Sequence, residues 1–452
     1  MEKLKALWKD MVESLWFWPG LLTLSCGALA LLLVRYDDEI KDLLGLDPEE
    51  MWWLFGGAAD GAMDVLAAIA GSIMTVTGVV FSVTIIALQL ASSQYTPRVL
   101  RQFMAHRANQ LTLGVFIGTF TYALLVLRTV RTDNATEEFI PSLAVTVAVL
   151  LTLTSMGFLI YFINHVARSM QAPVIIDSVA RDGLRVLAEV YPEEVHEWTE
   201  SEERSPEEIA SLDDSEAFRI RAAKAGYVQA VERASLLRFT TEHDLLVRME
   251  AQIGTHVLPG EVTMKVWPAR RVTGEMETRL RDVLVLGKER TPHQDLRHVI
   301  IEMMDIAVKA LSPSVNDPTT AINVIHRLAQ VLLDMAWRES GPALDRDDAG
   351  SVRVIVRRPD LAHVAALAYG QIRHYGAGNA TVMISLLDNL ADLAALSPDP
   401  ARQAFADQIN LAITSARERM TNPADTARLE EAIERALARS REQAPRQRPQ
   451  RA

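Results

Sequence analysis

The sequence predicts an α-helical integral membrane protein with four transmembrane helices and a large cytoplasmic α+β domain. Two observations lead to this fold class. The first 170 residues contain four long stretches without Asp, Glu, Lys or Arg, and they hold only 11 of the 46 Lys and Arg and 15 of the 58 Asp and Glu. After residue 170 the charge density rises, and alternating and helical hydrophobic patterns follow one another, as in an α+β domain.

The composition excludes several classes of protein. Of the 452 residues, 49% are hydrophobic and 23% are charged, and the uncharged stretches exclude a disordered chain and a purely soluble enzyme. The single cysteine, Cys26, excludes an intramolecular disulfide and a thiolate zinc site. The formal net charge is −12 and no basic face is evident, so we expect no nucleic-acid partner.

Each uncharged stretch has the length that a membrane-spanning helix requires. An α-helix rises about 1.5 Å per residue, so roughly 20 apolar residues cross a hydrocarbon core about 30 Å thick. The first stretch lacks a small-residue cleavage site, so we interpret it as a retained anchor rather than a signal peptide. The predicted transmembrane domain covers residues 1–170, with spans at about 16–34, 65–90, 111–127 and 140–163.

Lysine and arginine in the short flanks predict the orientation of these spans. Three such residues precede the first span, three lie between the second and third, and three follow the fourth, whereas the other two loops have two each. Flanks rich in Lys and Arg stay in the cytoplasm. We therefore expect a multi-pass protein with cytoplasmic N- and C-termini.

The second span carries small and polar residues on one face. Four polar residues recur every seven positions, and two glycines lie on a neighbouring row: Thr75, Ser82, Gln89 and Thr96, with Gly71 and Gly78. A seven-residue repeat keeps one stripe directed at a partner or a lumen across the whole helix. Two interpretations stay open. The stripe is a packing seam between helices, or copies of this helix line a polar pore in a homo-oligomer.

The loop between the first two spans is strongly acidic. Residues 35–64 hold nine acidic and two basic residues, which gives a net charge of −7. Under the pore interpretation this loop is an outer vestibule that concentrates cations; otherwise it is a solvated surface loop. The vestibule residues are Asp37, Asp38, Glu39, Glu49, Glu50, Asp60 and Asp64.

The chain after the spans divides into three parts. Residues 171–270 are expected to contain a cytoplasmic helix, an acidic linker and a small β unit with a turn at Pro259-Gly260. Residues 271–440 are expected to be mostly helical, and Asp317 before Pro318 predicts a helix start. Residues 441–452, rich in Pro, Gln and Arg, are expected to be a disordered tail.

One expected helix carries a set of side chains that suits a metal. His298, Glu302 and Asp305 have the spacing i, i+4, i+7. Side chains at this spacing share a helix face and can ligate a metal together. The pattern also fits a solvated face with ordinary salt bridges, and no HExxH motif or glycine-rich phosphate loop accompanies it. We therefore expect no cofactor and no catalytic residues, with a metal site at these three residues as an alternative.

Three separated motifs occur in order along the chain. The first joins Gly78–Ser82 to Gln89–Arg98, the second is Ala225–Gln229, and the third is Ala310–Pro318. Together they resemble the bacterial predicted membrane proteins of the domain of unknown function 2254 family, from the first anchor to about residue 420. The resemblance implies a bacterial inner-membrane location. It implies no activity, substrate or cofactor.

These observations predict an oligomeric inner-membrane ion channel, more suited to cations, whose cytoplasmic domain assembles the ring or senses a signal. Thr75, Ser82 and Gln89 would line the path, and Gly71 and Gly78 would allow close helix approach. The expected partners are the lipid bilayer, ions and further copies of the chain. Two alternatives stay open: a membrane-anchored structural or signalling scaffold without transport, and a membrane-anchored metalloenzyme.

Overall fold

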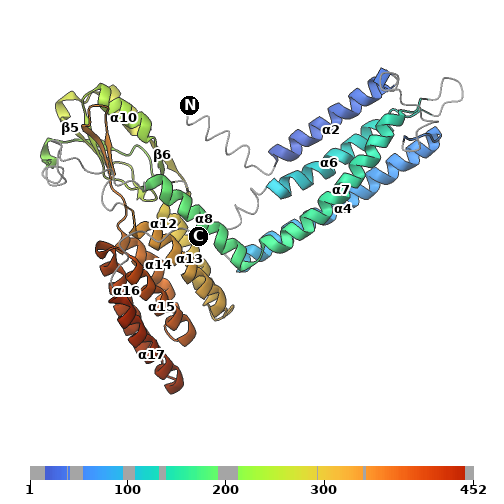
Figure 1. The fold of residues 1–452 in the computed structure, drawn as a ribbon. Helices are drawn as coiled ribbons and strands as arrows, with labels where there is room; N and C mark the ends of the chain where they lie inside the picture. Colours follow the sequence, from blue (N-terminus) through green and yellow to red (C-terminus); the bar gives the residue numbers. More distant parts are fainter. Residues whose placement is uncertain are drawn as a thin grey trace. The chain divides into compact units, whose positions relative to one another are not determined.

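The computed structural model in Figure 1 describes residues 16–37, 39–40, 54–94, 107–131, 139–191, 212–292, 294–338 and 343–442. The chain forms two compact units, Met1–Val174 and Ile175–Ala452. The predicted disordered tail from residue 443 onward, most of the acidic linker and Thr96 lie outside the described residues.

Unit 1 is built from four long apolar helices, which lie side by side in Figure 1. They are α2 (Phe17–Arg35), α4 (Ala59–Gln94), α6 (Arg107–Leu127) and α7 (Ser142–Ser169). Among the described residues, these are the four helices that are long and apolar enough to cross a membrane. The four predicted apolar segments are therefore confirmed as helices, and the second is longer than predicted because it begins at Ala59.

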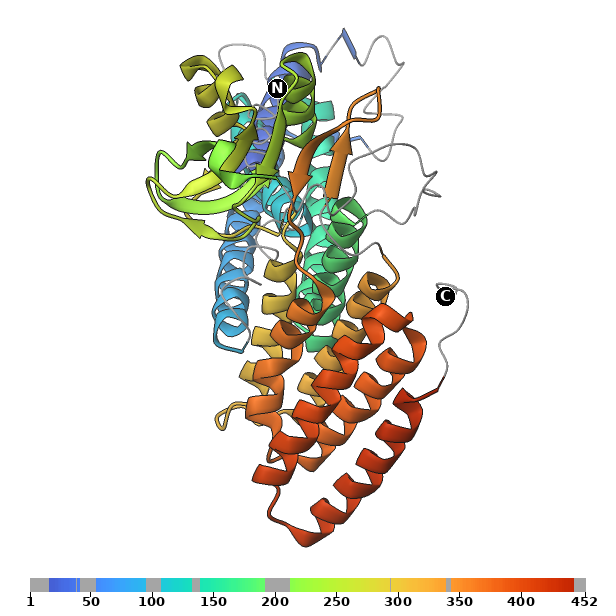
Figure 2. The ribbon, with the colours of Figure 1, turned by 90° about the vertical axis from the view of Figure 1, so that its left-hand side faces the viewer.

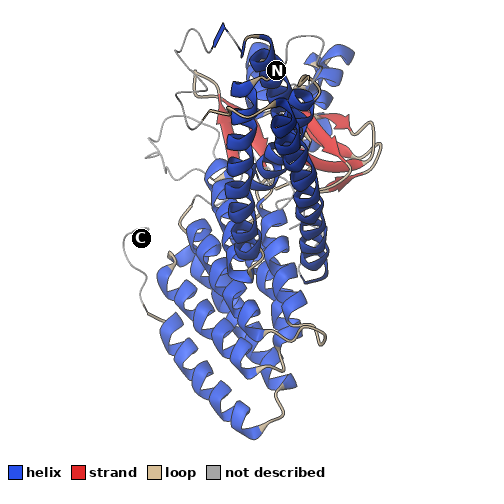
Figure 3. Cartoon of the chain, turned by 90° about the vertical axis from the view of Figure 1, so that its right-hand side faces the viewer, coloured by secondary structure: helices blue, strands red, loops and turns tan. Residues whose placement is uncertain are grey.

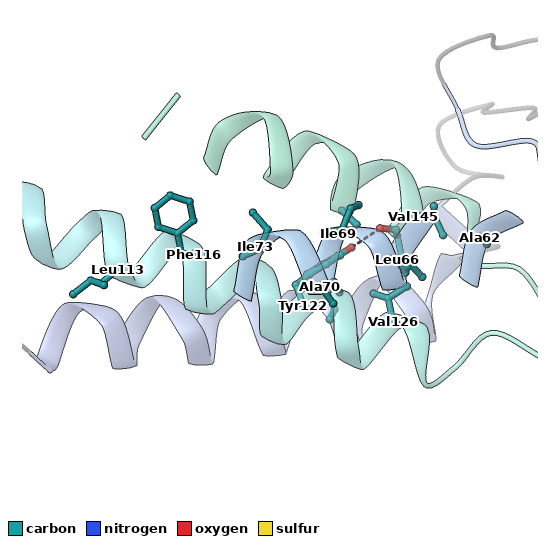
Figure 4. Packing of buried hydrophobic residues seen from close by; sticks show 14 of the residues in the cluster. Ala62, Leu66, Ile69, Ala70, Ile73, Leu113, Phe116, Tyr122, Val126 and Val145 are labelled. Atoms are coloured by element: carbon teal, nitrogen blue, oxygen red, sulfur yellow. Dashed lines mark hydrogen bonds between the residues drawn. The ribbon is translucent and has the colours of Figure 1, made fainter. Parts of the chain in front are cut away.

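Helix α6 is the central helix of this unit. It packs against α2, α4 and α7. In an 18-residue apolar stretch of α6, 56% of the residues are buried, compared with 11% in the corresponding stretch of α2, 17% in α4 and 28% in α7. Figure 4 shows Leu66, Ile69 and Ile73 of α4 beside Phe116 and Tyr122 of α6. Apolar side chains thus join the bundle along α6, while the described residues leave most of the surface of its neighbours uncovered.

The contact between α2 and α6 depends on two glycines one helical turn apart. A Cβ atom at Gly114 would lie 2.6 Å from Leu22 Cδ1 and 3.1 Å from Pro19 Cα. A Cβ atom at Gly118 would lie 2.8 Å from Cys26 Sγ. This is a GxxxG motif, in which missing side chains let two helix backbones approach each other. The spacing is visible in the sequence, but only the structure shows that α2 is the helix that approaches these glycines.

Hydrogen bonds inside the bundle link α6 to α7. Thr119 Oγ1 lies 3.1 Å from Ser155 Oγ, which links α6 to α7. The hydroxyl of Tyr122 donates to the carbonyl oxygen of Ala144 at 2.9 Å, the bond drawn in Figure 4. Hydrogen bonds between helices stabilise apolar bundles because a buried polar group without a partner is costly.

Unit 2 contains most of α8 (Ala172–Val190), two sheets and a group of helices, and Figure 3 shows its strands gathered in one region. Among the described residues, the first sheet has the order β1-β5-β3-β8-β7 and the second has the order β4-β2-β6. The strands are β1 (Phe218–Arg221), β2 (Gly226–Val231), β3 (Leu246–Met249), β4 (His256–Val257), β5 (Val262–Trp267), β6 (Leu284–Gly287), β7 (Ala343–Arg346) and β8 (Val352–Val356). Two helices accompany them, α10 (Arg233–Glu242) and α11 (Gly274–Asp282).

The larger sheet joins distant parts of the chain. Its strands are antiparallel except for β3 and β8, which pair in parallel with Val247 opposite Val354. Both valines are fully buried beside Met264. A strand at residues 352–356 was predicted, but its pairing with the β unit more than 100 residues earlier was not, because a local pattern carries no information about the partner strand.

The remaining helices of unit 2 lie next to one another, as Figure 2 shows for the orange and red segments. They are α12 (Leu296–Ala310), α13 (Pro318–Ala336), α14 (Leu361–Gly376), α15 (Ala380–Leu396), α16 (Asp399–Arg419) and α17 (Pro423–Ser440). Helices make up most of this region.

Two local predictions are confirmed in unit 2. The side chain of Asp317 accepts a hydrogen bond from the backbone N–H of Thr320 at 3.1 Å, and Pro318 is the first residue of α13. The residue before the helix therefore caps it, as the sequence indicates. Gly260 has φ +86°, and the N–H of Glu261 donates to the carbonyl oxygen of Leu258, so Pro259-Gly260 forms the predicted turn.

We expect Gly114→Ala to lower the free energy of unfolding by about 1–3 kcal/mol, because the added methyl group meets the backbone of α2. The control is Gly157→Ala on α7, where a Cβ atom would have nothing within 4 Å. Both changes give the same gain in helix propensity, so thermal unfolding in detergent reports the packing difference. Equal melting temperatures for the two variants would contradict the close contact of α2 with α6.

Candidate functional site

Helix α4 has two opposite faces, and the heptad stripe lies on the one that the described chain leaves uncovered. The buried face includes four residues that recur every seven positions, namely Leu66, Ile73, Val80 and Ala87. Thr75, Ser82 and Gln89 each lie two positions after one of these buried residues. Two positions correspond to a rotation of about 200° around the helix axis, so the polar side chains point away from the buried face. Accordingly, the stripe residues with described side chains are all exposed: Gly71, Thr75, Gly78, Ser82 and Gln89.

The two glycines on this face have open space around them. A Cβ atom at Gly71 or at Gly78 would have no heavy atom within 4 Å beyond its own helix and chain neighbours. These glycines therefore make no close helix contact of the kind that Gly114 makes with α2. Among the described residues, no helix packs closely on these two glycines.

The hydroxyl groups of the stripe donate to their own helix. Thr75 Oγ1 donates to the carbonyl oxygen of Gly71 at 2.9 Å, and Ser82 Oγ donates to that of Gly78 at 2.9 Å. Each hydroxyl proton therefore points along the helix, and the oxygen presents its lone pairs outward as an acceptor. Gln89 is exposed, and its amide is both a donor and an acceptor.

The acidic residues between α2 and α4 fall into two groups. Asp37 is 2% exposed and accepts a hydrogen bond from the backbone N–H of Leu143 at 3.1 Å, so it lies at the N-terminus of α7. Glu39, Asp60 and Asp64 are exposed. These three carboxylates are accessible to solvent, whereas Asp37 is held at the N-terminus of α7. Three further predicted vestibule residues, Asp38, Glu49 and Glu50, lie outside the described residues.

The predicted metal set lies on α12 of unit 2. His298 and Glu302 are buried and Asp305 is half-buried, on a helix that packs against α13 and α14. Within the described ranges, no group of three or more His, Cys, Asp or Glu side chains is arranged to hold a metal ion. The metalloenzyme stays a prediction.

Comparisons with known proteins found a matching family model and similar bacterial proteins. A family model described as a predicted membrane protein, DUF2254, matches residues 12–392. An uncharacterized protein of Mycobacterium tuberculosis strain CDC 1551 is similar, with 32% identity over 379 residues that cover 83% of this chain and 72% of the relative. An uncharacterized protein of Mycobacterium bovis is similar with the same identity and coverage. No solved structure matches.

We expect Asp37→Ala to lower the free energy of unfolding by about 1–2 kcal/mol, because it removes an anionic acceptor from the N-terminus of α7. Glu39→Ala is the matched control, since its side chain is exposed on the same segment. Thermal unfolding of both variants in detergent measures the difference. If Glu39→Ala destabilises the protein as much as Asp37→Ala does, the assigned role of Asp37 is wrong.

Proposed function

Because the chain belongs to the DUF2254 family of predicted membrane proteins, we propose that it is a multi-pass membrane protein whose copies assemble with α4 toward a shared polar path that conducts cations. The observation that carries the proposal is the position of the stripe on α4, opposite the face that packs on α6. The bacterial relatives support a bacterial inner membrane as its location.

The surface of the helix bundle supports placement in lipid. Large apolar side chains are exposed along three of its helices, and such a continuous apolar surface is unfavourable in water. Examples from α2, α4 and α7 are Leu24, Leu31 and Leu32, then Phe81, Val83 and Leu90, and Leu153, Ile160 and Ile163. The excess of Lys and Arg in the predicted inner flanks supports cytoplasmic termini.

The stripe itself supports assembly. In hydrocarbon, the amide of Gln89 would lose its hydrogen bonds with water, which costs several kcal/mol on transfer scales. A second copy or an aqueous path removes this cost. A seam with other copies and a water-filled lumen both explain an exposed polar stripe, but only the lumen also gives a role to outward-facing hydroxyl oxygens at Thr75 and Ser82.

The chemistry of the stripe favours cations over anions. Hydroxyl oxygens whose protons are already donated to the backbone offer lone pairs to a passing ion. The exposed carboxylates of Glu39, Asp60 and Asp64 would raise the local concentration of cations at the outer end. Among the stripe residues there is no basic side chain that would attract an anion.

We expect Ser82→Leu and Gln89→Leu each to reduce cation flux through reconstituted protein by about tenfold or more, because a bulky apolar side chain in a narrow path excludes water. Flux is measured in vesicles under an applied potassium gradient. The control is Met74→Leu, which replaces one exposed apolar side chain of α4 by another of similar volume.

Two results would overturn the channel. One is the absence of flux in the wild-type protein at every voltage and pH tested. The other is flux that is unchanged in both leucine variants. If either leucine variant instead alters only the stability of the oligomer, the scaffold without transport is the better description.

A further inference from the structure

A cavity of about 330 Å³ lies among α13, α15 and α17 in unit 2. Most of its lining comes from one face of α15, where lining residues follow at intervals of three and four positions. Ile322 and Ile384 supply apolar surface, and Ser385, Asp388 and Asn389 supply polar groups. Its volume falls in the range of small-molecule sites, which combine apolar walls with a few polar groups.

The polar groups of the cavity come from two helices. Across the cavity, His326 of α13 and Ser385 of α15 are joined by a contact of 3.4 Å between Nε2 and Oγ. The Oδ1 atom of Asn389 is buried and has no hydrogen-bond partner among the residues that the structure describes. A buried acceptor without a donor costs about 1–3 kcal/mol. A ligand with N–H donors would remove this cost.

The lining has two carboxylates, those of Asp388 and Asp392, and they differ in their distance from the nearest arginine of α17. Arg439 Nε lies 3.1 Å from Asp392 Oδ1, whereas Arg435 Nη2 lies 3.9 Å from Asp388 Oδ1. Burial raises the pKa of Asp388, an effect that Arg435 partly offsets and that Asp392 reinforces. Asp388 is therefore the carboxylate of this cavity that gains most from a further cation.

We propose that this cavity binds a small aliphatic amine. The ammonium group would pair with Asp388 and donate to the polar groups beside it, while the alkyl chain would contact Ile322 and Ile384. Of the two lining carboxylates, Asp388 has the longer ion pair, at 3.9 Å from Arg435, so an added ammonium group fits best beside Asp388. A divalent metal fits less well, because the described residues offer no group of three metal-ligating side chains.

Nucleophilic catalysis at Ser385 does not fit the geometry. Ser385 lies in the middle of α15, where the backbone N–H groups are bonded within the helix and cannot stabilise an oxyanion. The pair formed by His326 and Ser385 is therefore a recognition element. This binding site is independent of the proposed ion path, which lies in unit 1.

The test is isothermal titration calorimetry of the full chain in detergent with butylamine, and with 1-butanol as the uncharged control. We expect saturable binding of butylamine at neutral pH and at least about tenfold weaker binding of 1-butanol, since a charged hydrogen bond contributes about 1.5–3 kcal/mol. No saturable binding of butylamine, or equal binding of the two compounds, would overturn the proposal.

Two variants locate the site. Asp388→Asn should weaken butylamine binding about tenfold or more, and Ser385→Ala should weaken it less. Asp399→Asn on α16 is the control, because that carboxylate is 92% exposed and lies outside the cavity lining. If Asp388→Asn does not fold, Ser385→Ala and the comparison with 1-butanol still decide the result. Butylamine binding that is equal in wild type, Ser385→Ala and Asp399→Asn would place the amine elsewhere and overturn the assignment.

Discussion

Helix α6 packs against three other helices of its bundle, and this packing decides which face of each neighbour is uncovered. The glycines at 114 and 118 bring α2 close, while the heptad of Leu66, Ile73 and Val80 fixes the rotation of α4. Because the apolar seam of α4 faces α6, its polar stripe must face away from the described bundle. The direction of the stripe is thus a consequence of the core and not an independent feature.

The same packing separates structural polar groups from those available for function. Inside the bundle, Thr119 pairs with Ser155, Tyr122 with the backbone at Ala144, and Asp37 with the N-terminus of α7. On the uncovered face, the hydroxyls of Thr75 and Ser82 are satisfied within α4 but still present acceptor oxygens. For the exposed amide of Gln89, the structure describes no hydrogen bond within α4. This amide is therefore the strongest reason to expect another molecule or water beside α4.

Much of the fold could be predicted because its signals are local. Uncharged length identified the four apolar helices, and Asp317-Pro318 and Pro259-Gly260 identified a helix start and a turn. The sequence could not predict long-range contacts, because a local pattern does not identify a distant partner. Three such contacts are the parallel pairing of β3 with β8, the hydrogen bond of Asp37 with the N-terminus of α7, and the cavity beside Asp388. For the candidate site, the seven-residue period identified the stripe, but only packing shows that it is uncovered.

Cysteine cross-linking can show whether the stripe of α4 faces the same stripe in another copy of the chain. The single natural cysteine is removed by Cys26→Ala, and Ser82→Cys is introduced in that background, with Ile160→Cys on the exposed apolar surface of α7 as the control. We expect a bifunctional thiol reagent applied to native membranes to join subunits efficiently through position 82 and poorly through position 160. Monomers alone at position 82, with the reagent shown to have reacted there, would contradict it.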